Sequence, residues 1–289
     1  MLWPWPARCE CKAHGERRFR RWNQLSTTQF SVRHRNEKIG IALTLLGTVE
    51  EIWRYPVSSL SGEQLTSVEI EADGIPSDRN WCVVDAQSGN AASPEKEERW
   101  RPALFLQSRL AETVPEIGFP DGSWLAVTDP ETGLKLSQHF GFAAAVWPYE
   151  KGKAPMREDH RVAVNRYEPS PLHLITTSSL DHLSNLIGTE KVHSKRFRPT
   201  IVLRTHGDAE FREKAWIGQR LQIGAHIAAL ASEETKRCGL TLIAQPEITE
   251  NPEILRTILR QNRRNFGIYG SIETAGVVAI GDSVHLIDT

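Results

Sequence analysis

The chain has 289 residues, of which 39% are hydrophobic and 25% are charged, and its formal net charge is −1. This balance is typical of a globular protein with a sizeable core, and the length allows one large or two ordinary domains. A near-neutral chain is not expected to bind nucleic acid through its overall charge. No stretch approaches the roughly 18 apolar residues of a membrane span, so we expect a soluble, cytoplasmic protein.

The first 40 residues form a basic segment. Between Met1 and Lys38, nine Lys and Arg residues stand against three Glu, a net charge of +6. We expect a poorly ordered, solvated extension over residues 1–40. An organellar transit peptide is the alternative, although Glu10 and Glu16 weaken it. Nucleic acid is not an expected partner, because this basic run lacks a recognisable docking fold.

The four cysteines are too few and too scattered for a disulfide framework. Cys9 and Cys11 form a C-x-C pair, and no second pair completes a zinc or iron–sulfur site. Cys82 lies in an apolar, strand-like run and is predicted to be a small buried core residue. Cys238 is left as the candidate reactive thiol.

Short strand-like segments dominate residues 41–150. Residues 65–72 alternate apolar and polar side chains, the two-residue period of a half-buried strand. Strands are predicted, in chain order, at Thr48–Val57, Leu65–Ala72, Trp81–Asp85, Leu104–Leu110, Trp124–Thr128 and Leu134–Ser137. Strands at this density, without long helices between them, predict a barrel or a sandwich.

Residues 151–160 read as a linker that leads into a second domain at 161–289. Helices are predicted at Thr177–Ile187 and Pro252–Asn262, where apolar residues recur at helical spacing behind N-cap candidates. Further strands are predicted at Thr200–Arg204, Arg220–Ile223, His226–Ala231, Gly276–Val278 and Ser283–Ile287. The expected fold class is therefore mainly β with a few helices.

Reactive and charged side chains gather next to predicted strand ends. Two cations, the second being Arg237, directly precede Cys238, and nearby positive charge favours the thiolate that attacks substrates or binds metals. An ordinary half-buried thiol is the alternative. Arg79 and Arg198 are candidate anion ligands, because guanidinium forks match phosphate geometry. A solvated or aspartate-paired arginine is the alternative for each.

Seven short motifs follow one another between about Gly47 and Ile287. They are Tyr55–Gly62 (Y-P-V-S-S-L-S-G), Gly74 with Asp78–Trp81 (D-R-N-W), Arg198–Thr200 (R-P-T), Trp216–Gly224, Arg237–Thr241 (R-C-G-L-T), Phe266–Tyr269 (F-G-I-Y) and Gly281–Leu286 (G-D-S-V-H-L). Their order resembles the MOSC family, named for the C-terminal module of molybdenum cofactor sulfurases, and is similar in particular to the amidoxime-reducing molybdenum enzymes. The resemblance implies an N-terminal β-barrel-like domain over 41–150 and a MOSC β-barrel domain over 161–289.

The same resemblance implies a molybdenum–pterin cofactor (molybdopterin). Cys238 would be the catalytic residue and the metal ligand, since molybdenum takes soft sulfur donors. The implied cofactor ligands are Ser59, Arg79, Thr176, Thr177, Arg198, Thr200 and Arg237, which offer cationic, hydroxyl or helix N-terminal donors. The implied activity is reduction of N-hydroxylated or similar N–O small molecules. An external electron-transfer protein would be needed, because no ferredoxin-like cysteine set follows residue 287.

Three positions depart from the family pattern. Ser58 stands where lysine is usual, Thr200 where asparagine is usual, and Ala244 where the T-T-V-D-P loop after the cysteine has its carboxylate. Two alternatives therefore stay open: a carrier of sulfur or cofactor that uses Cys238, and a barrel without catalysis that serves protein interaction. Pyridoxal phosphate is a label inherited from full-length sulfurases, because the chain has no room for their desulfurase domain.

Overall fold

The structure is a computed structural model that describes residues 43–149, 161–163 and 170–287. The extension predicted at 1–40 and the linker predicted at 151–160 lie outside these residues. The described residues form sixteen strands, three α-helices and four short 3₁₀ helices. The predicted fold class, mainly β with a few helices, is confirmed. No helix in the described ranges is long and apolar enough to cross a membrane.

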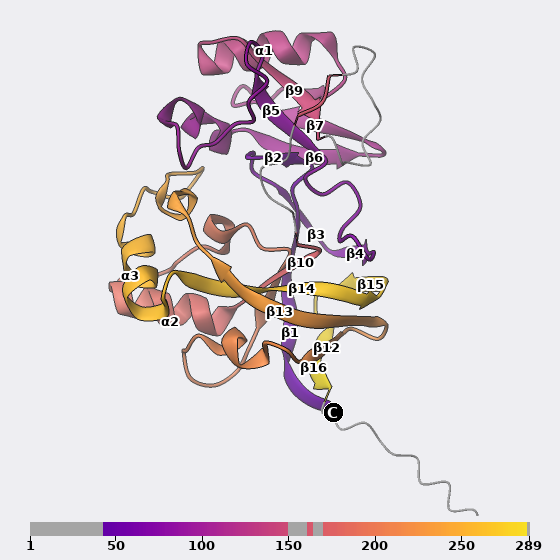
Figure 1. Cartoon of the computed structure of the whole chain (residues 1–289), viewed down its shortest axis with the longest axis vertical. Helices are drawn as coiled ribbons and strands as arrows, with labels where there is room; N and C mark the ends of the chain where they lie inside the picture. Colours follow the sequence, from indigo (N-terminus) through magenta and orange to yellow (C-terminus); the bar gives the residue numbers. More distant parts are fainter. Residues whose placement is uncertain (1–42, 150–160, 164–169, 288–289) are drawn as a thin grey trace, which may run out of the picture. The chain divides into compact units, whose positions relative to one another are not determined.

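Seven strands close into a barrel (Figure 1). In order around the ring they are β11 (Ile201–Arg204), β10 (Leu172–Thr176), β14 (Asn265–Thr274), β13 (Ile227–Lys236), β12 (Arg220–Ile223), β16 (Ser283–Ile287) and β1 (Leu43–Arg54). The antiparallel pairing of β1 with β11 completes the ring, and β3 (Glu63–Leu65) adds a further strand beside β1. β10 and β11 form a parallel pair within this otherwise antiparallel sheet.

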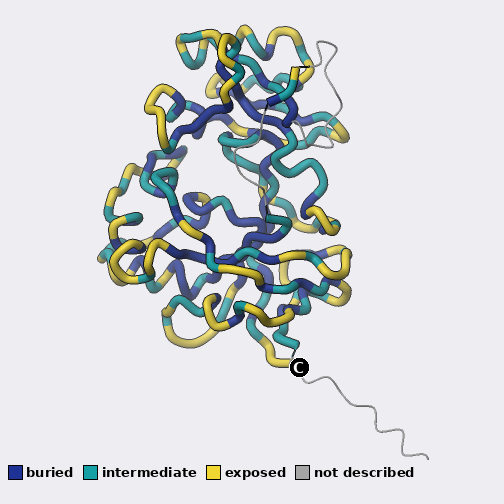
Figure 2. The backbone as a smooth tube through the Cα atoms, in the orientation of Figure 1, coloured by how far each residue is buried: buried dark blue, intermediate teal, exposed yellow. Residues whose placement is uncertain are grey.

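The barrel closes around an apolar interior. In β12 the side chain of Arg220 is exposed while Leu221 and Ile223 are fully buried, as the two-residue period of a strand requires. The interior cluster also includes Ile52 of β1 and Val284 of β16. Full burial of each such aliphatic side chain contributes roughly 1.5–3 kcal/mol. Figure 2 shows the same contrast along the chain, with buried strands and exposed loops.

Smaller sheets lie among residues 57–148. One contains β2 (Val57–Ser58), β5 (Trp81–Asp85) and β9 (Ala144–Pro148), and another contains β6 (Gln107–Ala111), β7 (Val114–Gly118) and β8 (Trp124–Ala126). They surround a separate apolar cluster that holds the fully buried rings of Trp81 and Trp100. β4 (Ser67–Ile70) pairs with β15 (Gly276–Ala279). By sequence, β1 and β3 fall in the predicted first domain at 41–150, yet they pair in one sheet with strands of the predicted second domain at 161–289. These domain limits therefore stay a prediction.

The helices test the predicted elements directly. α2 (Thr177–Ile187) has the predicted limits, and α3 (Glu253–Asn262) begins one residue later than predicted. The strand predicted at Leu134–Ser137 is wrong, because these residues lie in α1 (Pro130–Phe140). Asp129 caps that helix by accepting a hydrogen bond from the Glu131 amide at 2.8 Å. The predicted strand at Leu104–Leu110 begins inside the 3₁₀ helix η1 (Glu98–Phe105).

Candidate functional site

Two arginine side chains pack against the ring of Tyr55, which follows the last residue of β1. The Cζ atoms of Arg79 and Arg198 lie 4.7 and 4.2 Å from the ring centroid. Both arginines adopt a left-handed backbone, with φ of 53° and 52°, a conformation that persists in non-glycine residues only where the surroundings hold it. Burial raises the pKa of Tyr55 well above its ordinary value, so the phenol stays neutral beside the two cations.

The two arginines differ in how their guanidinium groups are used. Arg79 pairs with Asp78 and donates from Nη2 to the carbonyl of Arg198 at 3.1 Å. Arg198 donates from Nη1 to the carbonyl of Leu60 at 2.6 Å, whereas its buried Nη2 has no partner among the described residues. Burial lowers the pKa of Arg198 to about 10, which leaves it charged at neutral pH. A buried cationic donor without an acceptor is costly, so this N–H marks a place for an anionic ligand.

A buried histidine links the arginine pair to a third arginine. His173 lies in β10, and its Nε2 contacts Nη2 of Arg237 while its Nδ1 lies 3.1 Å from the carbonyl of Arg198. Because arginine only donates, Nε2 is the acceptor, and Nδ1 therefore carries the hydrogen that is donated to Arg198. Burial, reinforced by the charge of Arg237, lowers the pKa of His173 well below its ordinary value. The His173 ring is therefore neutral. His173 was not among the predicted site residues, because a single histidine in an apolar strand carries no sequence pattern that marks a functional site.

The guanidinium of Arg237 is hydrogen-bonded to backbone carbonyls. Its Nε donates to the carbonyl of Phe266 at 2.9 Å, and its Nη1 donates to the carbonyl of Phe197 at 3.1 Å. Burial lowers the pKa of Arg237 to about 10. These bonds fix the backbone immediately before Cys238, and together with His173 they connect that backbone to the carbonyl of Arg198.

Cys238 lies at the start of the 3₁₀ helix η4 (Gly239–Leu242) and is partly exposed. The Cys238 carbonyl accepts a hydrogen bond from the hydroxyl of Thr241 at 3.1 Å, and Arg196 donates to the Thr241 carbonyl at 3.0 Å. The described residues contain no group of three or more His, Cys, Asp or Glu side chains that would hold a metal.

Two other predicted ligands support neighbouring backbone. The Ser59 hydroxyl donates to the carbonyl of Ala92 at 3.1 Å. The Thr200 hydroxyl accepts a hydrogen bond from the His173 amide at 3.1 Å. The structure therefore brings Thr200, Arg198, His173 and Arg237 into one connected network.

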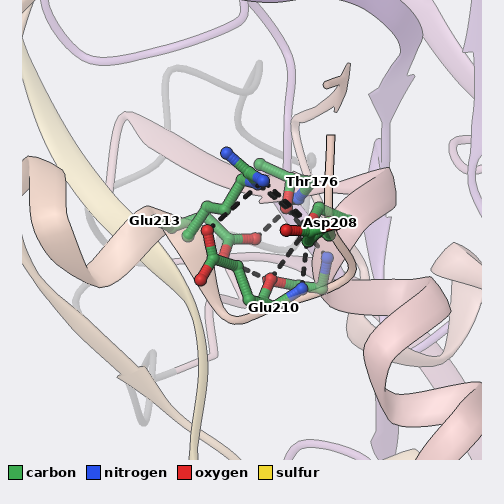
Figure 3. Close-up of polar contacts among 7 residues, drawn as sticks. Thr176, Asp208, Glu210 and Glu213 are labelled. Carbon is green, nitrogen blue, oxygen red and sulfur yellow. Dashed lines mark hydrogen bonds and ion pairs between the residues drawn. The ribbon is translucent and has the colours of Figure 1, made fainter. Parts of the chain in front are cut away.

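The N-terminus of α2 is filled by the chain itself (Figure 3). The Thr176 amide donates to Oε1 of Glu213 at 2.6 Å, the Ser179 hydroxyl donates to Oε2, and the Thr176 hydroxyl accepts from the Ser179 amide at 3.1 Å. The Thr177 hydroxyl accepts from the amide of Thr205 at 3.1 Å. Glu213 is 2% exposed, and burial raises its pKa. Thr176 and Thr177 thus lie in an internal network whose carboxylate occupies the position where an anionic ligand would bind.

A cavity of about 140 Å³ opens beside the arginine pair. Its lining includes Trp53, Tyr55, Lys195, Arg198 and Gln245. Three of these side chains carry a buried polar atom that has no partner among the described residues: Tyr55 Oη, Arg198 Nη2 and Gln245 Nε2. Buried polar groups in proteins are almost always paired, so three unpaired ones around one cavity indicate a ligand-binding site. We call this space the inner cavity.

The chain matches two family descriptions. Residues 46–139 match the MOSC N-terminal beta barrel domain, and residues 159–285 match the MOSC domain. The chain therefore belongs to the MOSC domain family, in the group that also carries the N-terminal barrel domain, as the sequence predicted.

Similar proteins include two human ones. "Mitochondrial amidoxime-reducing component 1" of Homo sapiens is 26% identical, over 85% of this chain and 84% of that protein. "Mitochondrial amidoxime reducing component 2" of Homo sapiens is 27% identical, over 84% of each chain. Among solved structures, the YUAD protein from Bacillus subtilis is 11% identical with a TM-score of 0.47, covering 85% of this chain and 98% of that one.

Proposed function

We propose that this MOSC protein binds a molybdenum–pterin cofactor and reduces N-hydroxylated or similar N–O compounds. The observation that carries the proposal is the unpaired, buried Nη2 of Arg198, whose backbone carbonyl is linked through His173 to Arg237, the residue directly before the partly exposed Cys238. Two relatives that cover most of the chain are amidoxime-reducing components, and an amidoxime contains an N–O bond.

The residues present fit such a cofactor. Its terminal phosphate needs a cationic donor without a protein partner, and Arg198 Nη2 is one. Arg79 packs on the same Tyr55 ring and donates a hydrogen bond to the Arg198 carbonyl. Cys238 offers the thiolate that molybdenum prefers. When bound, the group would supply the redox centre, while the protein residues bind it, orient it and hold the charge of its phosphate.

Two of the remaining predicted ligands have positioning roles in this proposal. Arg237 and Thr200 position the cysteine and arginine segments through His173. Ser59 has a left-handed backbone with φ of 70° and follows Ser58, where the family's lysine is missing. Thr176 and Thr177 are left out of the cradle, because Glu213 already uses the N-terminus of α2.

The electron source and the cellular location belong to the same proposal. An external electron-transfer protein would deliver electrons to the site. The relatives are named as mitochondrial proteins, which favours the organellar alternative for the basic segment 1–40 over the cytoplasm. Imaging of the full chain and of a variant with Arg17, Arg18, Arg20 and Arg21 replaced by glutamine distinguishes the two locations.

The proposal is tested by metal analysis and by pterin fluorescence after oxidation, on protein made in a host that synthesises the cofactor. Cys238→Ala is compared with wild type and with Cys82→Ala, which removes a cysteine that is 1% exposed in the core. Near-stoichiometric molybdenum and pterin that fall only in Cys238→Ala support the proposal. Pterin without molybdenum favours a cofactor carrier, and neither in wild type refutes cofactor binding.

A further inference from the structure

A second cavity adjoins the inner one. It measures about 420 Å³, and its lining includes the aromatic rings of Phe105, Phe119 and Trp124. Gln107 and Pro246 line both cavities, so the two cavities are adjacent. We call this second space the outer cavity. An apolar compartment next to a polar one is the usual form of a small-molecule site, where a few polar groups fix the orientation of an apolar body.

The inner cavity is electropositive. Lys195 and Arg198 are its two cations, and none of the described residues that line it is acidic. Lys195 is the cation that remains for a substrate once Arg198 holds the cofactor phosphate. The Lys195 ammonium lies 5.7 Å from the centroid of the Trp53 ring, which also lines the cavity. This cation–π contact keeps the positive charge of Lys195 at the cavity. A site with cations, neutral donors and no carboxylate selects an anion over a cation.

Gln245 stands where the family's loop pattern has proline. Its turn is fixed by two backbone hydrogen bonds with Ile248, each 2.9 Å long. The residue is 7% exposed, and its Nε2 is one of the unpaired donors. A rigid, buried amide donor beside Lys195 is suited to an acceptor oxygen that the ligand supplies.

We propose that the two cavities form one substrate site for a small molecule with a flat apolar body and an anionic head, and that Gln245 selects the head. The outer cavity holds the body, and Gln245 with Lys195 holds the head. Arg198 is left to the phosphate of the cofactor. The inference rests on the proposed function, because it places the substrate next to the cofactor cradle. It adds a charge requirement that the relatives' names do not contain.

The test is direct binding to the full-length protein by calorimetry, with molybdenum and pterin content measured on the same sample. Benzoate is the probe, and benzamide supplies the same flat body with a neutral head. We expect benzoate to bind more tightly than benzamide. Gln245→Leu and Lys195→Gln should each weaken benzoate about 3- to 10-fold, the loss of one hydrogen bond or partly exposed charge, and leave benzamide nearly unchanged. Lys191→Gln, another exposed lysine four residues earlier, is the matched control.

Two further variants keep the test decisive. Gln245→Glu should abolish the preference for benzoate and admit benzamidine, because it replaces a donor with a negative charge. Phe105→Ser should weaken benzoate and benzamide equally, because Phe105 belongs to the outer cavity. Unfolding temperatures of all variants are measured, and a fold defect would weaken every ligand alike.

The outcomes separate this inference from the proposed function. Protein that holds molybdenum and pterin but binds benzoate no better than benzamide overturns the inference alone. Selective benzoate binding by protein that holds no cofactor keeps the charge selection and refutes the proposed function.

Discussion

Glu213 is a buried carboxylate whose removal should destabilise the fold by a measurable and pH-dependent amount. It accepts hydrogen bonds from the Thr176 amide and the Ser179 hydroxyl at the N-terminus of α2. Glu213→Ala leaves both donors buried without that acceptor. Leaving a buried donor unsatisfied costs about 1–3 kcal/mol, so the expected loss from the two donors is about 2–6 kcal/mol. For a folded unit of this size, that corresponds to a fall in Tm of roughly 4–24 °C.

The pH dependence has a definite sign. Because burial raises the pKa of Glu213, the folded state keeps a proton that the unfolded chain has already lost. The contribution of this group to stability therefore falls as pH rises from the ordinary glutamate pKa of about 4.5 to the raised value in the folded state. Below that window both states are protonated and the contribution is complete. Glu213→Gln keeps an acceptor for Thr176 and removes this titration.

Urea unfolding followed by circular dichroism, in steps from pH 4 to pH 8, measures both effects. Other carboxyl groups titrate in the same range, so the informative quantity is the difference between wild type and Glu213→Gln at each pH. Glu210→Gln is the control, because Glu210 lies exposed in the same segment. A difference that does not change with pH, or a Glu213→Ala loss below about 1 kcal/mol, would refute the reasoning.

Three other variants test the site and the fold. Arg198→Lys should keep the hydrogen bond to the Leu60 carbonyl but lose the unpaired Nη2 donor. The pterin retained after dialysis should therefore fall about tenfold or more, and full retention would contradict the role given to Nη2. His173→Leu removes one of the two acceptors of Arg237 Nη2, the other being the Phe266 carbonyl, and removes the donor to the Arg198 carbonyl. It should lower the free energy of unfolding by about 1–3 kcal/mol, and a wild-type urea midpoint would remove His173 from the network. Asp129→Ala removes the cap of α1 and should cost about 1 kcal/mol in the same assay; a change below a few tenths would mean that the cap is dispensable.

Local signals decided which elements were predictable. α2 and β5 have their predicted limits, since a threonine cap and a continuous apolar run are local properties of the chain. α1 was misread because Leu134 and Leu136 alternate with polar residues, as in a strand. The structure exposes Leu134 by 68% and buries Leu136 completely, so the two leucines do not share one face. The capping residues Asp129 and Gly141 indicate a helix more strongly than the two leucines indicate a strand.

The site was predictable only in part, because its contacts join distant segments. Arg79 and Arg198 stood out by residue type, and the structure brings them together on one tyrosine across 119 positions of sequence. His173 meets Arg237 across 64 positions, and no periodicity encodes such a pair. The remaining assignments of ligands and of Cys238 stay predictions until the cofactor is measured.

The pairing of β1 with β16 has a consequence for how the molecule is made. Leu43 is paired with Ile287, so the barrel ring includes the first and the last described strands of the chain. During synthesis β1 leaves the ribosome long before its partner β16. The ring therefore cannot close until residue 287 has emerged, and β1 keeps one unpaired edge until then. A fragment limited to residues 161–289 would lack β1 and leave β11 and β16 as open edges, which makes aggregation its expected fate.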